Sequence, residues 1–473
     1  MNFATIQYLV FICVVFFLYW NLNKRWQNIL LLAASYFFYA NWDWRFLGLI
    51  LTLTVVNFIA GPRIVYATSH RTKKAWLVFS LAVSLGILGF FKYFHFFADS
   101  LVNFADVFGW HLSAPTLKII LPVGISFYTF QSISYVIDIY RDELKPTSSF
   151  IDFATFVAFF PQLVAGPIVR ASEFVFQLEK NRKFNPDDLQ NGLQRFLFGL
   201  FKKLFVADSI GIYLVDPVFA NPSHYSTATL WLALLGWSIQ IYADFSGYSS
   251  MAIGSAKILG FDIPENFAFP YLSKNISEYW RRWHKTMSRF FRDYVYIGLG
   301  GNRYGMKRSL VNIAITTSVS GLWHGAGWTF VTWGWLHGAY IAIYQTWRQL
   351  KKTHGWVRST PTLLTIIPAW ILTQMAISLS RILFRSPNFS TAWAYTKGLF
   401  GSFGTATIDV NFLVWFAFLT IVIDHIAGYV MERKPEIKLA IPVYLKAPLY
   451  AAMIIFLFQA RPESVNPYVY FQF

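Results

Sequence analysis

Charged residues are scarce in this chain. Only 13% of its 473 residues are Asp, Glu, Lys or Arg, whereas 56% are hydrophobic. Soluble domains carry roughly a quarter charged residues, so a water-soluble fold could not cover this much apolar surface. The composition excludes an ordinary soluble enzyme domain and predicts an all-α polytopic membrane protein whose apolar runs face lipid.

Cysteine and several catalytic motifs are also missing. The one cysteine, Cys13, lies in the first apolar run, which excludes an internal disulfide and a thiolate metal site. The sequence contains no GxxxxGK(S/T) phosphate loop, no HExxH zinc motif, no GxSxG elbow and no EF-hand. We therefore expect neither nucleotide-driven transport nor an internal serine hydrolase, and we expect no bound metal.

A series of apolar runs makes up most of the sequence. Several are about 20 residues long, which is the length of helix that crosses a hydrocarbon core. Others are short or broken by Gly or Pro, and a membrane tolerates such backbone only where protein or a watery cavity covers it. We expect about eleven transmembrane helices plus re-entrant pieces, in a single integral membrane domain over 1–473. The runs are 4–23, 27–41, 46–66, 75–97, 117–140, 151–166, 191–218, 228–258, 309–347, 361–383, 410–431 and 441–460.

Basic residues outnumber acidic ones by 40 to 23, which gives a net charge of +17. They gather in short clusters between apolar runs, as in cytoplasmic loops that face anionic lipid headgroups, and they form no groove suited to nucleic acid. The positive-inside rule therefore predicts that the N-terminus and the tail, 461–473, are extracytoplasmic. The clusters include 24–25, 71–74, 141–145, 348–352 and 433–438.

His324 is the histidine whose position suggests chemistry. It lies inside the apolar run 309–347, and both ends of this run carry basic residues. Both ends are therefore expected in the cytoplasm, and the run must turn back near Gly321, Gly325 and Gly327, which permit tight backbone. An ionisable group at membrane depth is costly and suggests a functional site, and an imidazole can accept and return a proton. Spacing alone leaves a hydrogen-bonded structural histidine equally open.

The segment 276–292 has the pattern of an amphipathic helix, with apolar residues on one face and arginines and lysines on the other. We predict one continuous interfacial helix in the cytoplasmic headgroup plane, with His284 on its shoulder near Trp280. Its basic face suits a polyphosphorylated cofactor such as coenzyme A, and lipid phosphate would explain it equally well. His337, on the next predicted helix, is expected only to satisfy a neighbouring polar group.

Six segments of the chain carry recognisable motifs: 122–131 (PVGISFYTFQ), 159–167 (FFPQLVAGP), 244–249 (DFSGYS), 279–284 (YWRRWH), 291–294 (FRDY) and 321–325 (GLWHG). Taken together, these segments resemble the membrane-bound O-acyltransferase family, above all its bacterial alginate O-acetylation branch. The resemblance also extends to the teichoic acid D-alanylation transporter, and it covers most of the chain in the same order. One departure is Ser250, which stands where the alginate branch usually has Asp, and it leaves open a detail of the polar lining or the exact polymer acted on.

This resemblance implies helices around a central channel and an O-acetyltransferase activity with acetyl-CoA as the acyl donor. It implies a catalytic role for His324, which lies in the family's Trp-His-Gly segment, and for His284, which falls at the family's second polar position. The residues that it implies for binding substrate or cofactor are Arg281, Arg282, Trp323, Asp244 and Gln131.

The end of the chain, 468–473 (YVYFQF), resembles the aromatic C-terminal signature of the alginate branch. It is also similar to the end of the small partner peptide in teichoic acid D-alanylation, whose acyl-carrying tyrosine matches Tyr470 by position. A phenol has a pKa of about 10 and is a poor nucleophile at neutral pH, so it would need a base such as a buried histidine. A tail that merely packs among headgroups is the alternative.

The sequence thus predicts a transferase of a bacterial inner membrane that moves an acetyl group from cytoplasmic acetyl-CoA to the other side for O-acetylation of an alginate-like polysaccharide. The resemblance implies an extracytoplasmic hydrolase-like acetyltransferase partner, which places the group on the polymer. Three alternatives stay open: a non-covalent acyl or lipid transporter, a scaffold of a polysaccharide export complex, and the same enzyme with another cargo such as D-alanine.

Overall fold

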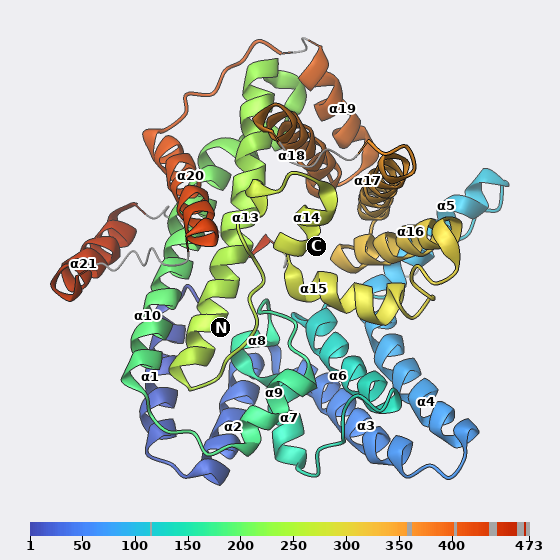
Figure 1. Ribbon diagram of the computed structural model, residues 1–473, viewed down its shortest axis with the longest axis vertical. Helices are drawn as coiled ribbons and strands as arrows, with labels where there is room; N and C mark the ends of the chain where they lie inside the picture. Colours follow the sequence, from blue (N-terminus) through green and yellow to red (C-terminus); the bar gives the residue numbers. More distant parts are fainter. Residues whose placement is uncertain (114–115, 357–361, 402–403, 435–441, 461–467, 470–473) are drawn as a thin grey trace. The chain divides into compact units, whose positions relative to one another are not determined.

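The computed structural model describes residues 1–113, 116–356, 362–401, 404–434, 442–460 and 468–469. Within these ranges the chain consists of α-helices with short 3-10 and π-helical segments, and its one β-pairing is an isolated bridge between Tyr225 and Ala406. The prediction of an all-α fold is therefore confirmed (Figure 1).

The chain divides into two compact units. The first comprises Met1–Leu197 with Ser249–Pro264, and the second comprises Phe198–Tyr248 with Glu265–Phe473. The prediction of one membrane domain over 1–473 stays a prediction. The helices that lie wholly in the first unit are α1 (Ile6–Trp20), α2 (Lys24–Asp43), α3 (Leu47–Val65), α4 (His70–Leu88), α5 (Phe94–Val107), α6 (Ile125–Tyr140), α7 (Phe150–Ala158), α8 (Phe160–Leu163) and α9 (Ala171–Glu179).

Two helices, α10 (Pro186–Phe201) and α13 (Thr227–Ile258), contribute residues to both units. The other α-helices of the second unit are α11 (Asp208–Ile210), α12 (Asp216–Ala220), α14 (Ile276–Arg282), α15 (Lys285–Phe290), α16 (Gly305–His324), α17 (Trp328–Thr353), α18 (Leu363–Arg385), α19 (Phe389–Phe400), α20 (Phe412–Arg433) and α21 (Val443–Ala460).

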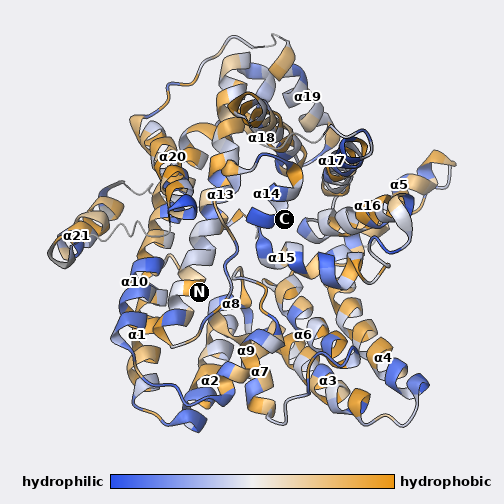
Figure 2. Ribbon diagram, viewed as in Figure 1, coloured by the Kyte–Doolittle hydropathy of each residue, from blue (hydrophilic) through white to orange (hydrophobic). Residues whose placement is uncertain are grey.

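Four helical stretches within the described ranges are long and apolar enough to cross a membrane: Lys24–Val65, His70–Val107, Leu363–Arg385 and Phe412–Arg433. Their large apolar side chains are widely exposed. Leu364 on α18 is 87% exposed and Phe412 on α20 is 74% exposed, and Figure 2 shows many hydrophobic residues on α20. Such surfaces are stable in lipid, which fits a membrane protein. The number of eleven transmembrane helices stays a prediction.

Helices α16 and α17 form a hairpin that turns directly after His324, as the glycines of this run predicted. The two helices pack closely because they meet at glycines. A Cβ atom on Gly321 would overlap the carbonyl oxygen of Phe330, and one on Gly334 would overlap that of Thr317. Small residues allow such backbone contact between helices in a membrane. The hairpin fixes His324 as the last residue of α16.

The prediction of one continuous amphipathic helix over 276–292 is wrong. Helix α14 ends at Arg282, and His284 adopts a left-handed conformation with φ of 41° before α15 begins. Backbone and side chain of Asn266 hold this break: its carbonyl oxygen accepts from the Lys285 N–H at 2.9 Å, and its Oδ1 accepts from the Thr286 hydroxyl at 2.7 Å. His284 therefore lies at a kink, fully buried, and not on the shoulder of an interfacial helix.

Candidate active site

His324 lies in an aromatic surrounding and is 3% exposed. The centre of its ring is 4.9 Å from that of Trp323, 5.1 Å from that of Trp333 and 5.2 Å from that of Phe384. These neighbours come from α16, α17 and α18, so three helices of the second unit position the imidazole. The predicted burial of His324 is confirmed.

His284 is fully buried beside the same tryptophan. Its ring centre is 4.5 Å from that of Phe245 on α13 and 5.8 Å from that of Trp323. Neither imidazole nitrogen has a hydrogen-bond partner among the residues that the structure describes. Burial lowers the pKa of His284 to about 3, because desolvation disfavours the imidazolium form. The imidazole is therefore neutral at pH 7.

Trp323 joins the two histidines that the sequence analysis placed in one site. Its indole contacts His284 on one side and is next to His324 in sequence, with ring centres 5.8 Å and 4.9 Å apart. Residues about forty positions apart in the chain thus share one buried aromatic neighbour. A neutral imidazole carries a lone pair that can accept a proton from a hydroxyl group, as a general base does, and the burial that lowers the pKa of His284 also makes its imidazole a weaker base.

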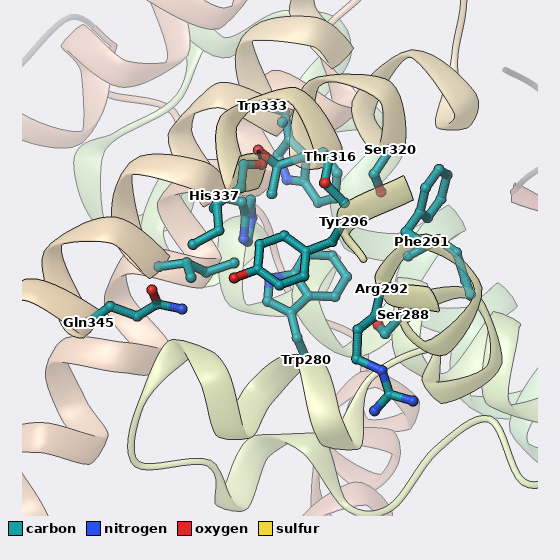
Figure 3. Close-up of a pocket in the computed structure, with 15 residues that line it drawn as sticks. Trp280, Ser288, Phe291, Arg292, Tyr296, Thr316, Ser320, Trp333, His337 and Gln345 are labelled. Carbon is teal, nitrogen blue, oxygen red and sulfur yellow. Dashed lines mark hydrogen bonds between the residues drawn. The ribbon is translucent and has the colours of Figure 1, made fainter. Parts of the chain in front are cut away.

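A cavity of about 250 Å³ is lined by neighbours of His324, although neither His324 nor His284 lines it. We call it the aromatic cavity. Ser320 lies one helical turn before His324 and lines the cavity, and Trp333, which packs against His324, lines it too (Figure 3). Its full lining is Trp280, Met287, Ser288, Phe291, Arg292, Tyr296, Ile313, Thr316, Thr317, Ser320, Trp333, Gly334, His337, Ile341 and Gln345.

His337 projects into the aromatic cavity (Figure 3). Its Nε2 lies 3.0 Å from the Ser380 hydroxyl oxygen, and its ring packs against Trp333 and Trp280 with centres 4.5 Å and 5.2 Å apart. The prediction that His337 satisfies a neighbouring polar group is confirmed by the Ser380 contact. Its place in the cavity wall was missed, because the sequence does not show which helix faces α17.

A second cavity of about 560 Å³ adjoins the first and shares Tyr296 and Gln345 with it. We call it the basic cavity, because Arg281, Arg348 and Lys352 line it. The first lies on α14 and the other two lie near the end of α17. Three cations around one hollow attract a polyanion. The rest of its lining is Ser277, Asn302, Gly305, Met306, Ser309 and Gln349, with the shared pair.

Arg282 differs from its neighbour Arg281. Its guanidinium forms ion pairs with Glu278 at 3.1 Å and with Glu432 at 2.6 Å. It lines a third hollow, of about 310 Å³, with Trp370 and other residues, and it lines neither the aromatic nor the basic cavity. The structure therefore puts Arg282 in contact with carboxylates and leaves Arg281 at the basic cavity.

Asp244 on α13 is buried in an ion cluster. The Nζ of Lys203 lies 2.8 Å from its Oδ1 and 2.9 Å from the Oδ1 of Asp208. Its Oδ2 accepts a hydrogen bond from the backbone N–H of Val469 at 2.8 Å. Asp244 thus contacts the C-terminal segment and lines neither cavity.

Two predicted residues lie elsewhere. Gln131 is buried on α6 in the first unit, and neither of its side-chain amide atoms has a hydrogen-bond partner among the described residues. Its role as a substrate-binding residue stays a prediction. Tyr470 lies outside the described residues, which end with Tyr468 and Val469.

The sequence analysis missed Lys203, Asp208 and Tyr468. Both charged residues lie within the apolar run 191–218, and charges at membrane depth are a general sign of function. The sequence therefore carries a signal for Lys203 and Asp208. The contact of Tyr468 with the site could not be read from the sequence, because it depends on how the tail folds back.

The family pattern described as MBOAT, membrane-bound O-acyltransferase family, matches residues 8–386. A Pseudomonas aeruginosa protein named probable alginate O-acetylase AlgI is 42% identical over 84% of this chain and 74% of its own length. A Pseudomonas putida protein of the same name is 38% identical over 98% of both chains. A Helicobacter pylori protein named peptidoglycan O-acetyltransferase is 36% identical over 82% of this chain and 76% of its own.

The matched region contains both histidines, the tryptophan between them and the two cavities. It also contains the six internal segments, from 122–131 to 321–325, that carry the resemblance, so the predicted family is confirmed, and the tail segment 468–473 lies beyond the match. These relatives are named as O-acetylases or O-acetyltransferases, which supports the enzyme interpretation of this chain. The chain belongs to the membrane-bound O-acyltransferase family and is an O-acyltransferase.

Proposed function

We propose that this protein takes an acetyl group from cytoplasmic acetyl-CoA and passes it across a bacterial inner membrane for O-acetylation of an alginate-like exopolysaccharide. The observation that carries this proposal is the pair of adjoining cavities, because Trp333 in the lining of the aromatic cavity also packs against His324. The basic cavity suits the phosphates of coenzyme A through Arg281, Arg348 and Lys352. The aromatic cavity suits the apolar arm that bears the thioester.

His324 is the proposed general base. An acceptor hydroxyl attacks the thioester carbonyl carbon while His324 takes the hydroxyl proton. An oxygen–carbon bond forms, the carbon–sulfur bond breaks, and the proton passes to the departing thiolate. His284 is the second proposed catalytic residue. The Trp323 indole contacts the imidazoles of both His284 and His324.

The proposed first acceptor is the hydroxyl of Tyr470. Val469, its neighbour in sequence, is anchored to Asp244, and Tyr468 packs within the same unit as both histidines. In this proposal the tail is extracytoplasmic, as is the N-terminus, and an extracytoplasmic hydrolase-like partner takes the acetyl group from the tyrosine ester to polymer hydroxyls. Tyr470→Phe lacks the acceptor oxygen, so it should abolish acetyl-peptide formation as measured by mass spectrometry of the C-terminal peptide.

The polymer is inferred from the relatives, two of which are named alginate O-acetylases and one a peptidoglycan O-acetyltransferase. Ser250, which stands where the alginate branch usually has Asp, lies on α13 and is the residue to vary when polymers are compared.

Purified protein with radiolabelled acetyl-CoA provides the test. The unmodified protein should release free CoA and transfer the label to its C-terminal peptide or to polymer. His324→Ala should lower both rates by at least about a hundredfold, because general base catalysis contributes that much. His111 is a matched control, since its side chain is 90% exposed, and His111→Ala should keep the full rate. Full activity in His324→Ala would contradict the proposal.

A further inference from the structure

A buried cluster of three charged side chains lies in the second unit. Lys203, Asp208 and Asp244 have side chains that are only 1%, 2% and 1% exposed. Burying charges is costly, and at membrane depth it is a general sign of function. Two carboxylates around one ammonium leave a formal negative charge within this trio when both are ionised, and such a charge favours a nearby hydrogen-bond donor.

Backbone packing fixes the cluster. A Cβ atom on Gly247 of α13 would lie 2.8 Å from the carbonyl oxygen of Gly199, so the two backbones approach closely there. Lys203 belongs to η3 (Lys202–Ala207), a π-helical segment that interrupts the regular helix after α10. Such π-bulges redirect side chains and occur often at functional sites. In this arrangement the Lys203 ammonium contacts Asp244, which lies about one helical turn before Gly247 on α13.

The C-terminal segment binds to the carboxylate oxygen of Asp244 that does not contact Lys203. Asp244 uses Oδ1 for Lys203 and Oδ2 for the backbone N–H of Val469, at 2.8 Å in both cases. Val469 is 5% exposed, so water does not compete at this contact. A hydrogen bond between a peptide N–H and a carboxylate is charge-assisted and stronger than a neutral one.

Tyr468 fills an aromatic slot beside the same anchor. It is fully buried, and its ring centre is 4.3 Å from that of Tyr248 and 5.9 Å from that of Phe245. Tyr248 lies four residues after Asp244 and three after Phe245, which puts it next to both of them on the surface of α13. Phe245 also contacts His284 at 4.5 Å. Phe245 therefore contacts both Tyr468 of the tail and His284.

We infer that Asp244, held by Lys203, is the receptor for the chain's own C-terminal segment: it binds the backbone N–H of Val469 while the Tyr248 and Phe245 slot takes Tyr468. Asp244 is then a positioning residue, and it does not bind the acyl donor. Its effect on acetyl transfer rests on the proposed function, because Tyr470 directly follows the anchored residue in the sequence. Recognition through the backbone makes the identity of the side chain at 469 secondary.

Cysteine labelling tests the docking without using activity. The background is Cys13→Ser with Val469→Cys, which keeps the backbone N–H. A water-soluble maleimide should label this protein slowly in detergent. Adding Asp244→Leu should raise the labelling rate at least tenfold, whereas Asp244→Asn, which retains an acceptor oxygen, should raise it less. Equal rates in all three proteins would overturn the inference.

A second pair of variants leaves the ion cluster untouched and decides the matter if Asp244→Leu does not fold. Val469→Pro removes the N–H that Asp244 accepts, and Val469→Ala keeps it. Transfer of label from acetyl-CoA should fall at least tenfold in Val469→Pro and less than threefold in Val469→Ala. Equal transfer in both would contradict the inference. Failure of the proposed function would look different, because the unmodified protein would release no CoA while the labelling contrast stayed.

Discussion

His284 combines two properties that one substitution can separate. Its φ of 41° is in the left-handed region, where Asn and His are among the few non-glycine residues found often. Its imidazole is buried against Phe245 and Trp323. The residue can therefore serve the backbone as a hinge, the reaction as a neutral acceptor, or both.

His284→Asn should separate the two roles. Asparagine tolerates the left-handed conformation, so the melting temperature of the detergent-solubilised protein should change by only a few degrees. Loss of the imidazole should lower CoA release about tenfold or more. A matched variant, His284→Val, should lower the melting temperature, because a β-branched residue is strained there. Full activity of His284→Asn would show that His284 has only the backbone role and no catalytic role.

Sequence reasoning predicted a role for His324 from its place inside an apolar run, and it predicted roles for His284 and Trp323 because their segments resemble a known family. It did not find Lys203, although a lysine within an apolar run is visible in the sequence. The reason is physical: whether such a lysine reaches headgroups or a buried carboxylate depends on a π-helical turn and on the glycine contact with α13. Neither is encoded in a local pattern.

At the scale of elements, the hairpin of α16 and α17 rests on glycine contacts that hold His324 in place. A Cβ atom on Gly321 would overlap the Phe330 carbonyl oxygen, whereas one on Gly327 meets only side-chain atoms at 3.5 Å and beyond. Gly321→Ala must therefore push the helices apart, and Gly327→Ala need not.

Gly321→Ala should destabilise the hairpin by about 1–3 kcal/mol, which is typical of overpacking. We expect a lower melting temperature and a loss of CoA release, because His324 moves with the helix end. Gly327→Ala is the control and should keep its melting temperature. If both variants melt alike, the close contact between α16 and α17 does not govern the position of His324.

The two arginines at the end of α14 have different surroundings. Arg281 lines the basic cavity, whereas Arg282 pairs with Glu278 and Glu432. Neighbouring residues on a helix point about 100° apart, and the sequence analysis predicted a binding role for both arginines because the sequence does not show which one faces a cavity and which one pairs with carboxylates. The structure separates them.

Arg281→Gln should raise the KM for acetyl-CoA about tenfold with little change in kcat, because one charge-assisted contact to phosphate is lost. Raising the salt concentration should narrow the difference from the unmodified protein, since ions screen the attraction. Arg282→Gln should instead lower the melting temperature and leave the KM within about twofold. Equal KM effects of the two substitutions would argue against the basic cavity as the donor site.

At the scale of the whole molecule, composition was enough to predict helices in a membrane, and the all-α architecture agrees. One part of the orientation predicted from the loop charges can be compared with the structure of the first unit, namely that two basic clusters lie on the same side of the membrane. Lys73 and Asp142, from two loops predicted to be cytoplasmic, form an ion pair at 3.0 Å, so these two loops lie on one side. The break at His284 could not be predicted, because distant hydrogen bonds from Asn266 hold it.

The predicted orientation has a direct test on α18 and α20, which are two of the four stretches apolar enough to span a membrane. Basic residues follow α17 and α20, so the positive-inside rule puts His354 in the cytoplasm and the connection before α20, with Asp409, outside. Both side chains are exposed and accessible to reagent. The single native cysteine, Cys13, makes a cysteine-free background simple.

In a Cys13→Ser background, a membrane-impermeant maleimide applied to intact spheroplasts should label Asp409→Cys and not His354→Cys. Permeabilising the membrane should then expose His354→Cys to the reagent, which controls for its reactivity. The reverse pattern would invert the orientation and remove the tail from the extracytoplasmic side. The proposed transfer would then lack its direction, because donor and acceptor would no longer approach His324 from opposite sides.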